Sequence, residues 1–600
     1  MKKSIKFMTM LGAMSLLTGC GKQNNDPKPI PEDDKVHLFI LAGQSGARGK
    51  ALNSDLSSED SKTNKDIQIF ADGYTMPELN NIPETINSKI RLKDTAPGFG
   101  DSTNEFGPEL GMAKALKARF PKTEDDLYRA GIIKFSACGS TFYDDWMSES
   151  TVSDESLKIN RDKLVTNEKL DKLTGPLTNN FYQIIDKAIE TYSDLGYETV
   201  IDGVIFVHGE QDAKYDENMA VYEKALENFI KDVRGYVNNE DLPFVITEAL
   251  TNSAKYSNKL REIQYKVATN TKNCIYVDTS DLYTNTFEPW HFGAESNITL
   301  GERAVSELIR LKDNRVIKDF KETMINLPIN AKVDLPKYLT AIFEDDSEAI
   351  VPVSYSEYDN TKLGEATLKV TANYNTHEFS KDIKINITND PYVDGVINEF
   401  TYNENETNSI GDKVKFSVSK NDEGIFIQAK ASDNDIWTDG EAWHTGDMGQ
   451  MNKNDDLEIF LDASGDSNEA TSRYSIFLSS ANLLRVYDKG TDTSKDDTKL
   501  ANANLVYKGK ANNFIHRVNT FGDVNGGSNN GMNMELFIPY SDLNIKDPSK
   551  IKMMFKYRDV SSKDNGKTKE VTSYYLKKDK EDNTNFEKNL KNYFDLEELI

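Results

Sequence analysis

Strand-like and helix-like patterns alternate from Val36 to about residue 314, and this alternation limits the possible folds more than any other feature of the chain. The strand-like runs are short, apolar and rich in β-branched residues: VHLFILAG, AGIIKFSA, VIDGVIFVHG, LPFVITEAL and CIYVDTSDL. Amphipathic stretches such as FGPELGMAKALKARF and TLGERAVSELIRL lie between and after them. The pattern predicts an α/β/α three-layer domain at 36–314, with a parallel sheet covered by helices on both faces.

The remaining sequence has a different pattern. From about residue 315, short alternating runs are separated by Asn, Asp and Gly, which is typical of β-sandwiches. A chain of 600 residues is also too long for one hydrophobic core and should form about three or four units. We therefore predict a multidomain protein in which two β-sandwich domains, 315–389 and 390–600, follow the α/β domain.

The first residues have the features of an export signal: a Lys-rich start, a short apolar stretch and small residues before Cys20. The ending LLTGC resembles a bacterial lipobox. This resemblance implies a lipoprotein signal peptide at 1–19, acylation of Cys20, and a protein anchored to the bacterial cell membrane and facing outward. The polar, Pro-containing segment 20–35 is then a tether. The alternative is an ordinary signal peptide followed by an incidental cysteine.

Charge and cysteine content exclude some functions. The net charge of -26 disfavours a nucleic-acid partner. If Cys20 is lipidated, only Cys138 and Cys274 remain, and both lie in or next to apolar runs, so we expect buried free thiols. The spacing of Cys and His indicates no zinc site, and we expect neither a metal nor a cofactor.

Four segments that carry chemistry follow predicted strands. Ser45 lies between Gly43 and Gly46 in AGQSG, and CGSTFYDDW, HGEQD and EPWH follow later strands. In parallel sheets, ligands bind where the carboxyl ends of the strands meet the loops. A serine hydrolase needs a base, an acid that orients the base, and donors for the oxyanion, and these segments supply each type. Taken alone, AGQSG would be equally typical of a turn serine that caps the next segment.

These motifs, with GPELG at Gly107–Gly111, resemble the SGNH hydrolase superfamily, in its sialate O-acetylesterase and acetylxylan-esterase branch (carbohydrate esterase family 6-like). The resemblance covers about 280 residues and implies a flavodoxin-like fold. The branch has AGQSN, a Gly-Gly-Ser-like turn ending in Trp, QGExD and DxxH. This chain departs from the pattern after Ser45, at His208, and at Glu288, where an Asp is expected.

The resemblance implies a catalytic triad. Ser45 is the expected nucleophile, His291 the general base and Glu288 the acid that orients it. Glutamate serves as the third member of known triads. Asp281 or Asp278 is the alternative for the orienting acid.

The resemblance also implies an oxyanion hole. The backbone amides of Ser45 and Gly139 are the expected donors. The side chain of either Gln211 or His208 is expected as the third donor, and the sequence does not decide between them.

Other residues near these motifs are candidates for substrate binding: Gln44, Arg48 and Glu210. Arg48 could hold a sugar carboxylate through two hydrogen bonds, or pair only with a local carboxylate. Glu210 and Asp212 could instead organise the site through hydrogen bonds. Trp146 is more typical of packing than of a sugar-binding platform.

The rear domains resemble carbohydrate-associated modules. Segment 315–389 resembles bacterial Ig-like modules, and 390–600 resembles a family 9 carbohydrate-binding module. Trp437 and Trp443 lie in a polar, loop-like setting and are expected either to stack on sugar rings or to fill the core. The carboxylates of NKNDDLEIFLDASGD are a candidate structural calcium site.

Together these features predict a carbohydrate O-acetylesterase that removes acetyl esters from glycans of the sialic acid or xylan type through an acetyl-enzyme. The expected partners are the acetylated glycan and, through Cys20, the membrane. The alternative is a catalytically impaired surface lipoprotein that only binds carbohydrate, and the altered motifs are its best support.

Overall fold

The computed structural model describes most of the chain: residues 35–86, 92–247, 254–282, 290–321, 324–331, 333–398, 407–438, 454–463, 473–488, 504–505, 514–525, 529–543, 545, 547–563, 568–580 and 589–600. Cys20 with the predicted signal peptide and tether, Glu288 and Trp443 lie outside these residues. None of the helices in the described ranges has the length and apolar character needed to cross a membrane.

A seven-stranded sheet forms the middle of the N-terminal domain, in the order β11-β10-β9-β1-β6-β3-β4. All neighbouring strands run parallel except β4, which pairs antiparallel with β3 at one edge. The strands are β1 (Lys35–Gly43), β3 (Asn64–Tyr74), β4 (Leu92–Thr95), β6 (Ala130–Ala137), β9 (Glu198–Val207), β10 (Phe244–Thr247) and β11 (Cys274–Val277).

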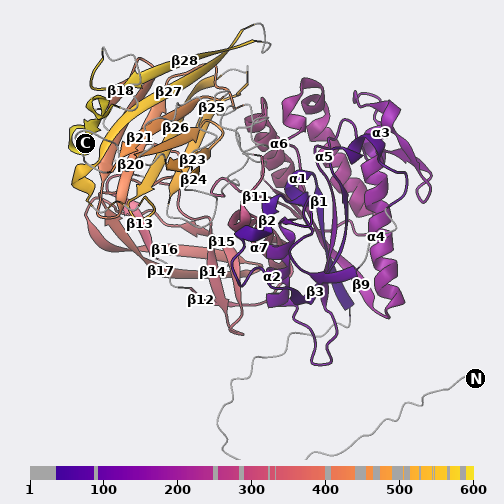
Figure 1. Ribbon diagram of the computed structural model, residues 1–600. Coiled ribbons are helices and arrows are strands. Elements are labelled where there is room, and N and C mark those ends of the chain that lie inside the picture. Colours follow the sequence, from indigo (N-terminus) through magenta and orange to yellow (C-terminus); the bar gives the residue numbers. More distant parts are fainter. Residues whose placement is uncertain are drawn as a thin grey trace, which may run out of the picture. The chain divides into compact units, whose positions relative to one another are not determined.

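Helices cover both faces of this sheet (Figure 1). Along β1, Leu38 and Ile40 belong to one buried cluster with residues of α4, α5 and α6, whereas Phe39 and Leu41 belong to another with residues of α2 and α7. Alternate residues of a strand point to opposite faces, so each face has its own core. The predicted three-layer fold is confirmed. The helices are α1 (Ser45–Arg48), α2 (Glu109–Arg119), α3 (Glu149–Ser153), α4 (Pro176–Asp194), α5 (Asp216–Tyr236), α6 (Ser257–Asn270) and α7 (Ala294–Arg310).

Four short strands form two small ribbons beside the main sheet. Strand β2 (Ala51–Leu52) pairs with β5 (Glu105–Phe106), and β7 (Val165–Asn167) pairs with β8 (Lys172–Thr174). The first ribbon joins the segment after α1 to the segment before α2.

The next part of the chain is a six-stranded sheet in the order β12-β14-β15-β16-β17-β13. Buried residues alternate with exposed ones along its strands, as the sequence pattern predicts. The strands are β12 (Ile317–Phe320), β13 (Ile325–Pro328), β14 (Tyr338–Phe343), β15 (Glu348–Tyr355), β16 (Gly364–Tyr374) and β17 (His377–Thr388).

The last part contains two larger sheets, ordered β18-β19-β20-β26-β25 and β24-β23-β22-β21-β27-β28, with β29 paired to β27. Residues of both sheets share one core, in which the rings of Phe416 and Phe555 lie 4.3 Å apart, so this part is a β-sandwich. The strands are β18 (Asn408–Ile410), β19 (Val414–Lys420), β20 (Gly424–Ala431), β21 (Asp456–Asp462), β22 (Arg473–Ser479), β23 (Leu483–Asp488), β24 (Asn504–Leu505), β25 (Ile515–Gly522), β26 (Asn529–Pro539), β27 (Lys552–Lys563), β28 (Thr568–Leu576) and β29 (Phe594–Asp595).

Candidate active site

Ser45 lies at a sharp turn between β1, the middle strand of the parallel sheet, and α1. The turn needs glycine at Gly43, because its φ is +137° and a Cβ there would lie 2.0 Å from the carbonyl oxygen of Val207 in β9. The N–H of Gln44 donates to that same oxygen at 3.0 Å. The end of β9 therefore holds the turn, and Ser45, which is partly exposed, begins the helix.

The side chain of Gln44 joins this turn to the HGEQD segment. Its Oε1 accepts a hydrogen bond from the N–H of Gly209 at 3.3 Å, and its Nε2 donates to the carboxylate of Glu210. Gln44 is 3% exposed and Glu210 8% exposed. These two candidates for substrate binding bind one another and position the turn, which agrees with the alternative that Glu210 organises the site.

The expected backbone donors lie at the same edge of the sheet. Ser45 is the first residue of α1, where an N–H has no acceptor within the helix. Gly139 follows the neighbouring strand β6 and has a φ of +70°. The N–H groups on either side of it, those of Cys138 and Ser140, donate to Tyr74 and Ala137. The arrangement is consistent with an oxyanion hole formed by two amides.

His208 and Gln211 lie in different surroundings. The ring of His208 is buried among aromatic side chains: it stacks on Phe206 at 5.0 Å and meets Phe142 at 4.8 Å. Burial lowers the pKa of His208 to about 3, so the ring is neutral. Gln211 is partly exposed in the loop after β9. The buried position of His208 argues against a role as oxyanion donor and leaves Gln211 as the better candidate.

Asp212 connects two of the sequence motifs. It is fully buried, and its Oδ1 accepts a hydrogen bond from the N–H of Phe142 in the CGSTFYDDW segment at 3.0 Å. Burial raises the pKa of Asp212 well above its usual value. Asp212 therefore organises the site, as one of the sequence-based alternatives proposed.

His291 lies in the loop between β11 and α7 and is 6% exposed. Of the two alternative acids, Asp281 forms a two-pronged ion pair with Arg303 at 2.7 and 2.5 Å, and Asp278 accepts hydrogen bonds from both the N–H and the hydroxyl of Ser280. Both carboxylates therefore have these other partners, and Glu288, the expected orienting acid, lies outside the described residues.

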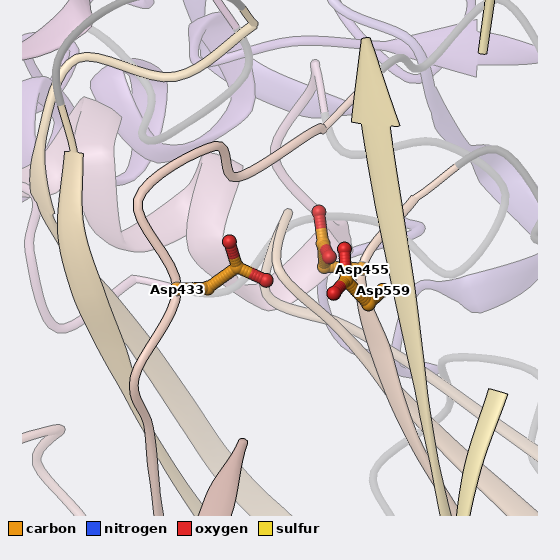
Figure 2. A group of neighbouring side chains, drawn as sticks. All are labelled: Asp433, Asp455 and Asp559. Atoms are coloured by element: carbon orange, nitrogen blue, oxygen red, sulfur yellow. The ribbon is translucent and has the colours of Figure 1, made fainter. Parts of the chain in front are cut away.

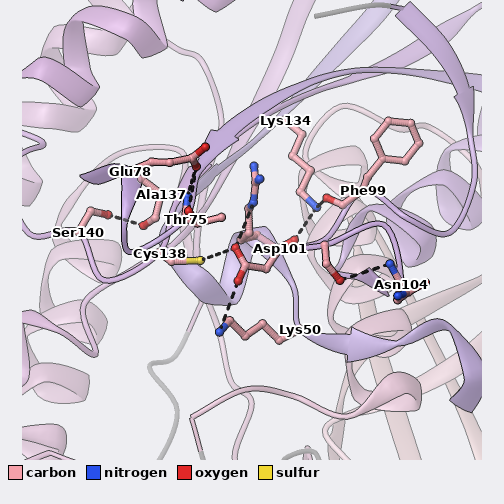
Figure 3. Close-up of polar contacts among 12 residues, drawn as sticks. Lys50, Thr75, Glu78, Phe99, Asp101, Asn104, Lys134, Ala137, Cys138 and Ser140 are labelled. Carbon is pink, nitrogen blue, oxygen red and sulfur yellow. Dashed lines mark hydrogen bonds and ion pairs between the residues drawn. The ribbon is translucent and has the colours of Figure 1, made fainter. Parts of the chain in front are cut away.

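Arg48 lies one turn after Ser45 and contacts a local carboxylate. Its Nε is 3.8 Å from Oδ1 of Asp101, and the Nζ of Lys50 is 3.5 Å from Oδ2. The Cys138 thiol donates to Asp101 at 3.4 Å (Figure 3). The local pairing, one of the two alternatives for Arg48, is therefore present.

Both cysteines of the described chain are free thiols, as expected. Cys138 is buried and Cys274 is partly buried. Burial raises the pKa of each thiol to about 12, so neither is a reactive thiolate.

The sequence motifs did not reveal the ion pair between Lys134 and Glu109. Lys134 interrupts the otherwise apolar strand IIKFSA, and Glu109 is the acid of GPELG. Both side chains are almost completely buried, and their Nζ and Oε2 atoms lie 2.6 Å apart. A lysine in the middle of a buried strand is unusual without a partner, and this is the signal that could have identified the pair.

Two of the tryptophans in the described residues, Trp146 and Trp437, are buried. Trp146 is fully buried and donates to the Ser140 hydroxyl at 2.9 Å, which confirms the expected packing role. Trp437 is 7% exposed and its Nε1 donates to Asp435 at 3.0 Å. This burial favours the core alternative for Trp437 over a sugar-binding platform.

Three carboxylates in the β-sandwich could face a cation: Asp433, Asp455 and Asp559 (Figure 2). One oxygen from each lies within 4.8 Å of the others. Burial raises the pKa of Asp433 and of Asp455. The Nζ of Lys413 lies 2.8 Å from Asp559 and 4.0 Å from Asp433, so this ammonium already supplies part of the required positive charge.

The α/β domain thus has a serine at the end of the middle strand, a histidine before the last helix and turn amides at the carboxyl end of the sheet, which are the groups that a serine ester hydrolase needs. Residues 35–310, less than half of the chain, match the family described as carbohydrate esterase, sialic acid-specific acetylesterase. The family resemblance expected from the motifs is thereby confirmed for this domain. The match supports carbohydrate esterase activity.

Solved structures with similarity to the chain include two carbohydrate-related proteins and NanS. A carbohydrate acetylesterase from Xanthomonas citri is 13% identical, with 58% of this chain and 79% of that one covered and a TM-score of 0.32. NanS is 16% identical, with 47% of this chain and 98% of that one covered and a TM-score of 0.31. A family 9 carbohydrate-binding module from Caldicellulosiruptor kristjanssonii, in complex with cellotriose, is 12% identical, with 34% of this chain and 87% of that one covered and a TM-score of 0.22. Comparison with curated proteins gives no significant match.

Proposed function

We propose that the protein is a serine O-acetylesterase that removes acetyl groups from glycans of the sialic acid or xylan type. The observation that carries this proposal is the Ser45 turn, which β9 and the Gln44–Glu210 pair hold at the carboxyl end of the middle strand. The family match of residues 35–310 supports the choice of an acetylated carbohydrate as substrate.

In the proposed reaction, His291 takes the proton of the Ser45 hydroxyl as its oxygen attacks the acetyl carbonyl. Glu288 orients the imidazole. The amides of Ser45 and Gly139, with the side chain of Gln211, donate to the oxyanion. The sugar alcohol leaves with the proton from His291, and water then hydrolyses the acetyl-enzyme to acetate.

We also propose that Cys20 carries a lipid and anchors the protein to the outer face of the bacterial cell membrane. The sequence LLTGC after a Lys-rich, apolar start supports this proposal. A lipid-anchored enzyme of this kind would act on glycans outside the cell.

The first prediction is that Ser45→Ala abolishes acetate release, with kcat for p-nitrophenyl acetate lower by about 10⁴-fold or more, because the attacking oxygen is lost. A fluorophosphonate probe should label the unchanged protein at Ser45 but not the variant. Ser54→Ala, at an exposed serine whose hydroxyl donates to the neighbouring Asp55, is the matched control and should retain activity and labelling.

Turnover that persists in Ser45→Ala would contradict the proposed nucleophile. An unchanged protein that is neither labelled nor active would instead favour a carbohydrate-binding lipoprotein with an impaired site. Acetate release from O-acetylated sialic acids and from acetylxylan, measured in parallel, then identifies the substrate class.

A further inference from the structure

Both residues of the Lys134–Glu109 ion pair are buried: Lys134 is 1% exposed and Glu109 0% exposed. Taking two charges out of water is unfavourable unless their remaining hydrogen-bonding groups are satisfied. The Lys134 ammonium meets this condition. Its three hydrogens are matched by three acceptors, the Glu109 carboxylate at 2.6 Å and the carbonyl oxygens of Arg48 and Phe99 at 2.8 Å each.

One of these acceptors belongs to the helix that carries Ser45. Arg48 is the last residue of α1, and the final carbonyl oxygens of a helix accept no hydrogen bond from within that helix. Phe99 lies in the loop that also contains Asp101, whose N–H donates to Gly49 at 2.9 Å (Figure 3 shows Lys134 beside Phe99). Lys134 therefore ties the end of α1 to this loop.

The other partner, Glu109, fixes the segment Gly107–Gly111. Its two carboxylate oxygens accept hydrogen bonds from the N–H of Gly107 at 3.0 and 3.1 Å. Because the same carboxylate binds Lys134, the position of this segment depends on that of the Ser45 helix.

Gly107–Gly111 also contacts the helix next to His291. A Cβ on Gly111 would lie 1.9 Å from the carbonyl oxygen of Ile298 in α7, and a Cβ on Gly301 would lie 2.1 Å from the carbonyl oxygen of Pro108. Helices α2 and α7 thus approach closely through these two glycines. Helix α7 begins three residues after His291, and its Asn297 side chain donates to the carbonyl oxygens of Phe292 and Gly293.

We propose that Gly107–Gly111 and Lys134 form a bracket that sets the position of Ser45 relative to His291. The bracket is connected to the serine through Lys134 and Arg48 and to the histidine through α7. Its members are positioning residues, because they are buried and act through other groups. The inference rests on the proposed function, since a nucleophile and its base must lie within hydrogen-bond reach, and a shift of about 1 Å can lower the rate about 100-fold.

The test compares variants of the full chain with p-nitrophenyl acetate and a fluorophosphonate probe. Lys134→Met alone leaves Glu109 buried without its partner and could unfold the domain, so the main variant is the uncharged pair Lys134→Met with Glu109→Gln. We expect it to retain native circular dichroism, to lose about 30- to 100-fold in kcat with less than about 3-fold change in KM, and to be labelled more slowly by a similar factor.

Lys114→Met is the matched control. Lys114 is on the same helix, α2, and forms an ion pair with Glu302 of α7 at 2.7 Å, but its side chain is 59% exposed. This variant removes a charged contact between the same two helices without reaching the bracket, and its kcat should stay within about 2-fold of the unchanged protein.

The outcomes separate the two proposals. A folded double variant whose kcat and labelling rate stay within 3-fold overturns the bracket and leaves the esterase proposal intact. An equal loss of kcat in Lys114→Met also overturns the bracket, because any weakening of the α2–α7 contact would then suffice. An unchanged protein that releases no acetate and takes no probe overturns the proposed function, and the bracket with it.

Discussion

At Ser45 the chain passes from strand to helix within two residues, and groups from the end of β9 and the loop after it hold the turn. Val207, at the end of β9, accepts the N–H of Gln44, and Glu210 and Gly209 hold the Gln44 side chain. A serine in a glycine-flanked turn is common. Here the residue before it, Gln44, is held by three buried partners, so the turn has a fixed position. This restraint is the residue-level reason for regarding Ser45 as a positioned nucleophile.

The contrast between His208 and Gln211 gives a prediction at the residue scale. His208→Phe should retain kcat within about 3-fold, because its ring fills an aromatic pocket and a phenyl ring can replace it. Gln211→Ala should lower kcat by about 10²-fold, the usual effect of losing one oxyanion donor. Steady-state kinetics with p-nitrophenyl acetate measures both, and the reverse order of effects would identify His208 as the donor.

Asp145 gives a prediction on pH. Burial raises its pKa from 3.8 to about 7 in the folded protein, while its Oδ2 accepts the N–H of Thr141 at 2.9 Å. A carboxyl group with a raised folded-state pKa contributes most to stability below pH about 4, and this contribution is lost as pH rises to about 7. Asp145→Asn, which cannot ionise but keeps an acceptor, should therefore gain stability relative to the unchanged protein as pH rises.

The gain in the free energy of unfolding of Asp145→Asn has an upper limit of about 4 kcal/mol. The pKa of Asp145 rises from 3.8 to about 7 on folding, and each pKa unit corresponds to about 1.4 kcal/mol. Urea unfolding of both proteins at pH 4 and pH 8, followed by near-ultraviolet circular dichroism, measures the difference. A free-energy difference that is the same at both pH values would show that Asp145 does not titrate in this range.

At the scale of elements, the site depends on a helix crossing on one face of the sheet. Helices α2 and α7 both belong to the core on one face, and their close approach needs Gly111 and Gly301. Amphipathic periodicity predicts α7 and which of its faces is apolar. It does not predict which helices touch, because residue spacing along one helix contains no information about its partner.

Gly111→Ala tests this crossing. Alanine favours a helix by about 1 kcal/mol over glycine, but here its Cβ would overlap the Ile298 carbonyl oxygen, so we expect a net loss of about 1–3 kcal/mol in stability and a lower kcat. Gly235→Ala in α5 is the matched control, since a Cβ there meets no atom within 4 Å, and it should be neutral or stabilising. Thermal unfolding and kcat are the readouts. A Gly111→Ala protein as stable and active as the Gly235→Ala protein would contradict the close crossing.

At the scale of the whole molecule, the chain combines one α/β domain with β-sheet domains, and its net charge of -26 is spread over all of them. The carbohydrate esterase family match is confined to residues 35–310. The remaining half contributes no group to the candidate active site in the described residues. Its aromatic residue Trp437 is largely buried, so a sugar-binding role for the sandwich would need other side chains.

The proposed lipid anchor gives a prediction for the whole molecule. In cells fed with a labelled fatty acid, the full-length chain should incorporate the label and remain with the membrane fraction, whereas Cys20→Ala should do neither. Cys138→Ala, at a buried thiol, is the control and should behave like the unchanged protein. Label retained by Cys20→Ala would place the modification elsewhere.

The sequence by itself determined the alternation of strands and helices in the N-terminal domain, the change from α/β to β structure near residue 315, and the four motifs that point to an ester hydrolase. Periodicity and turn residues encode these features locally, so they can be read along the chain. The sequence did not reveal β3, β4 or α4. Only the tertiary structure decided that the His208 ring is buried among aromatic side chains, that Gln44 binds Glu210, and that Lys134 connects α1 to GPELG. These contacts join residues far apart in sequence, and their burial depends on which strands and helices become neighbours.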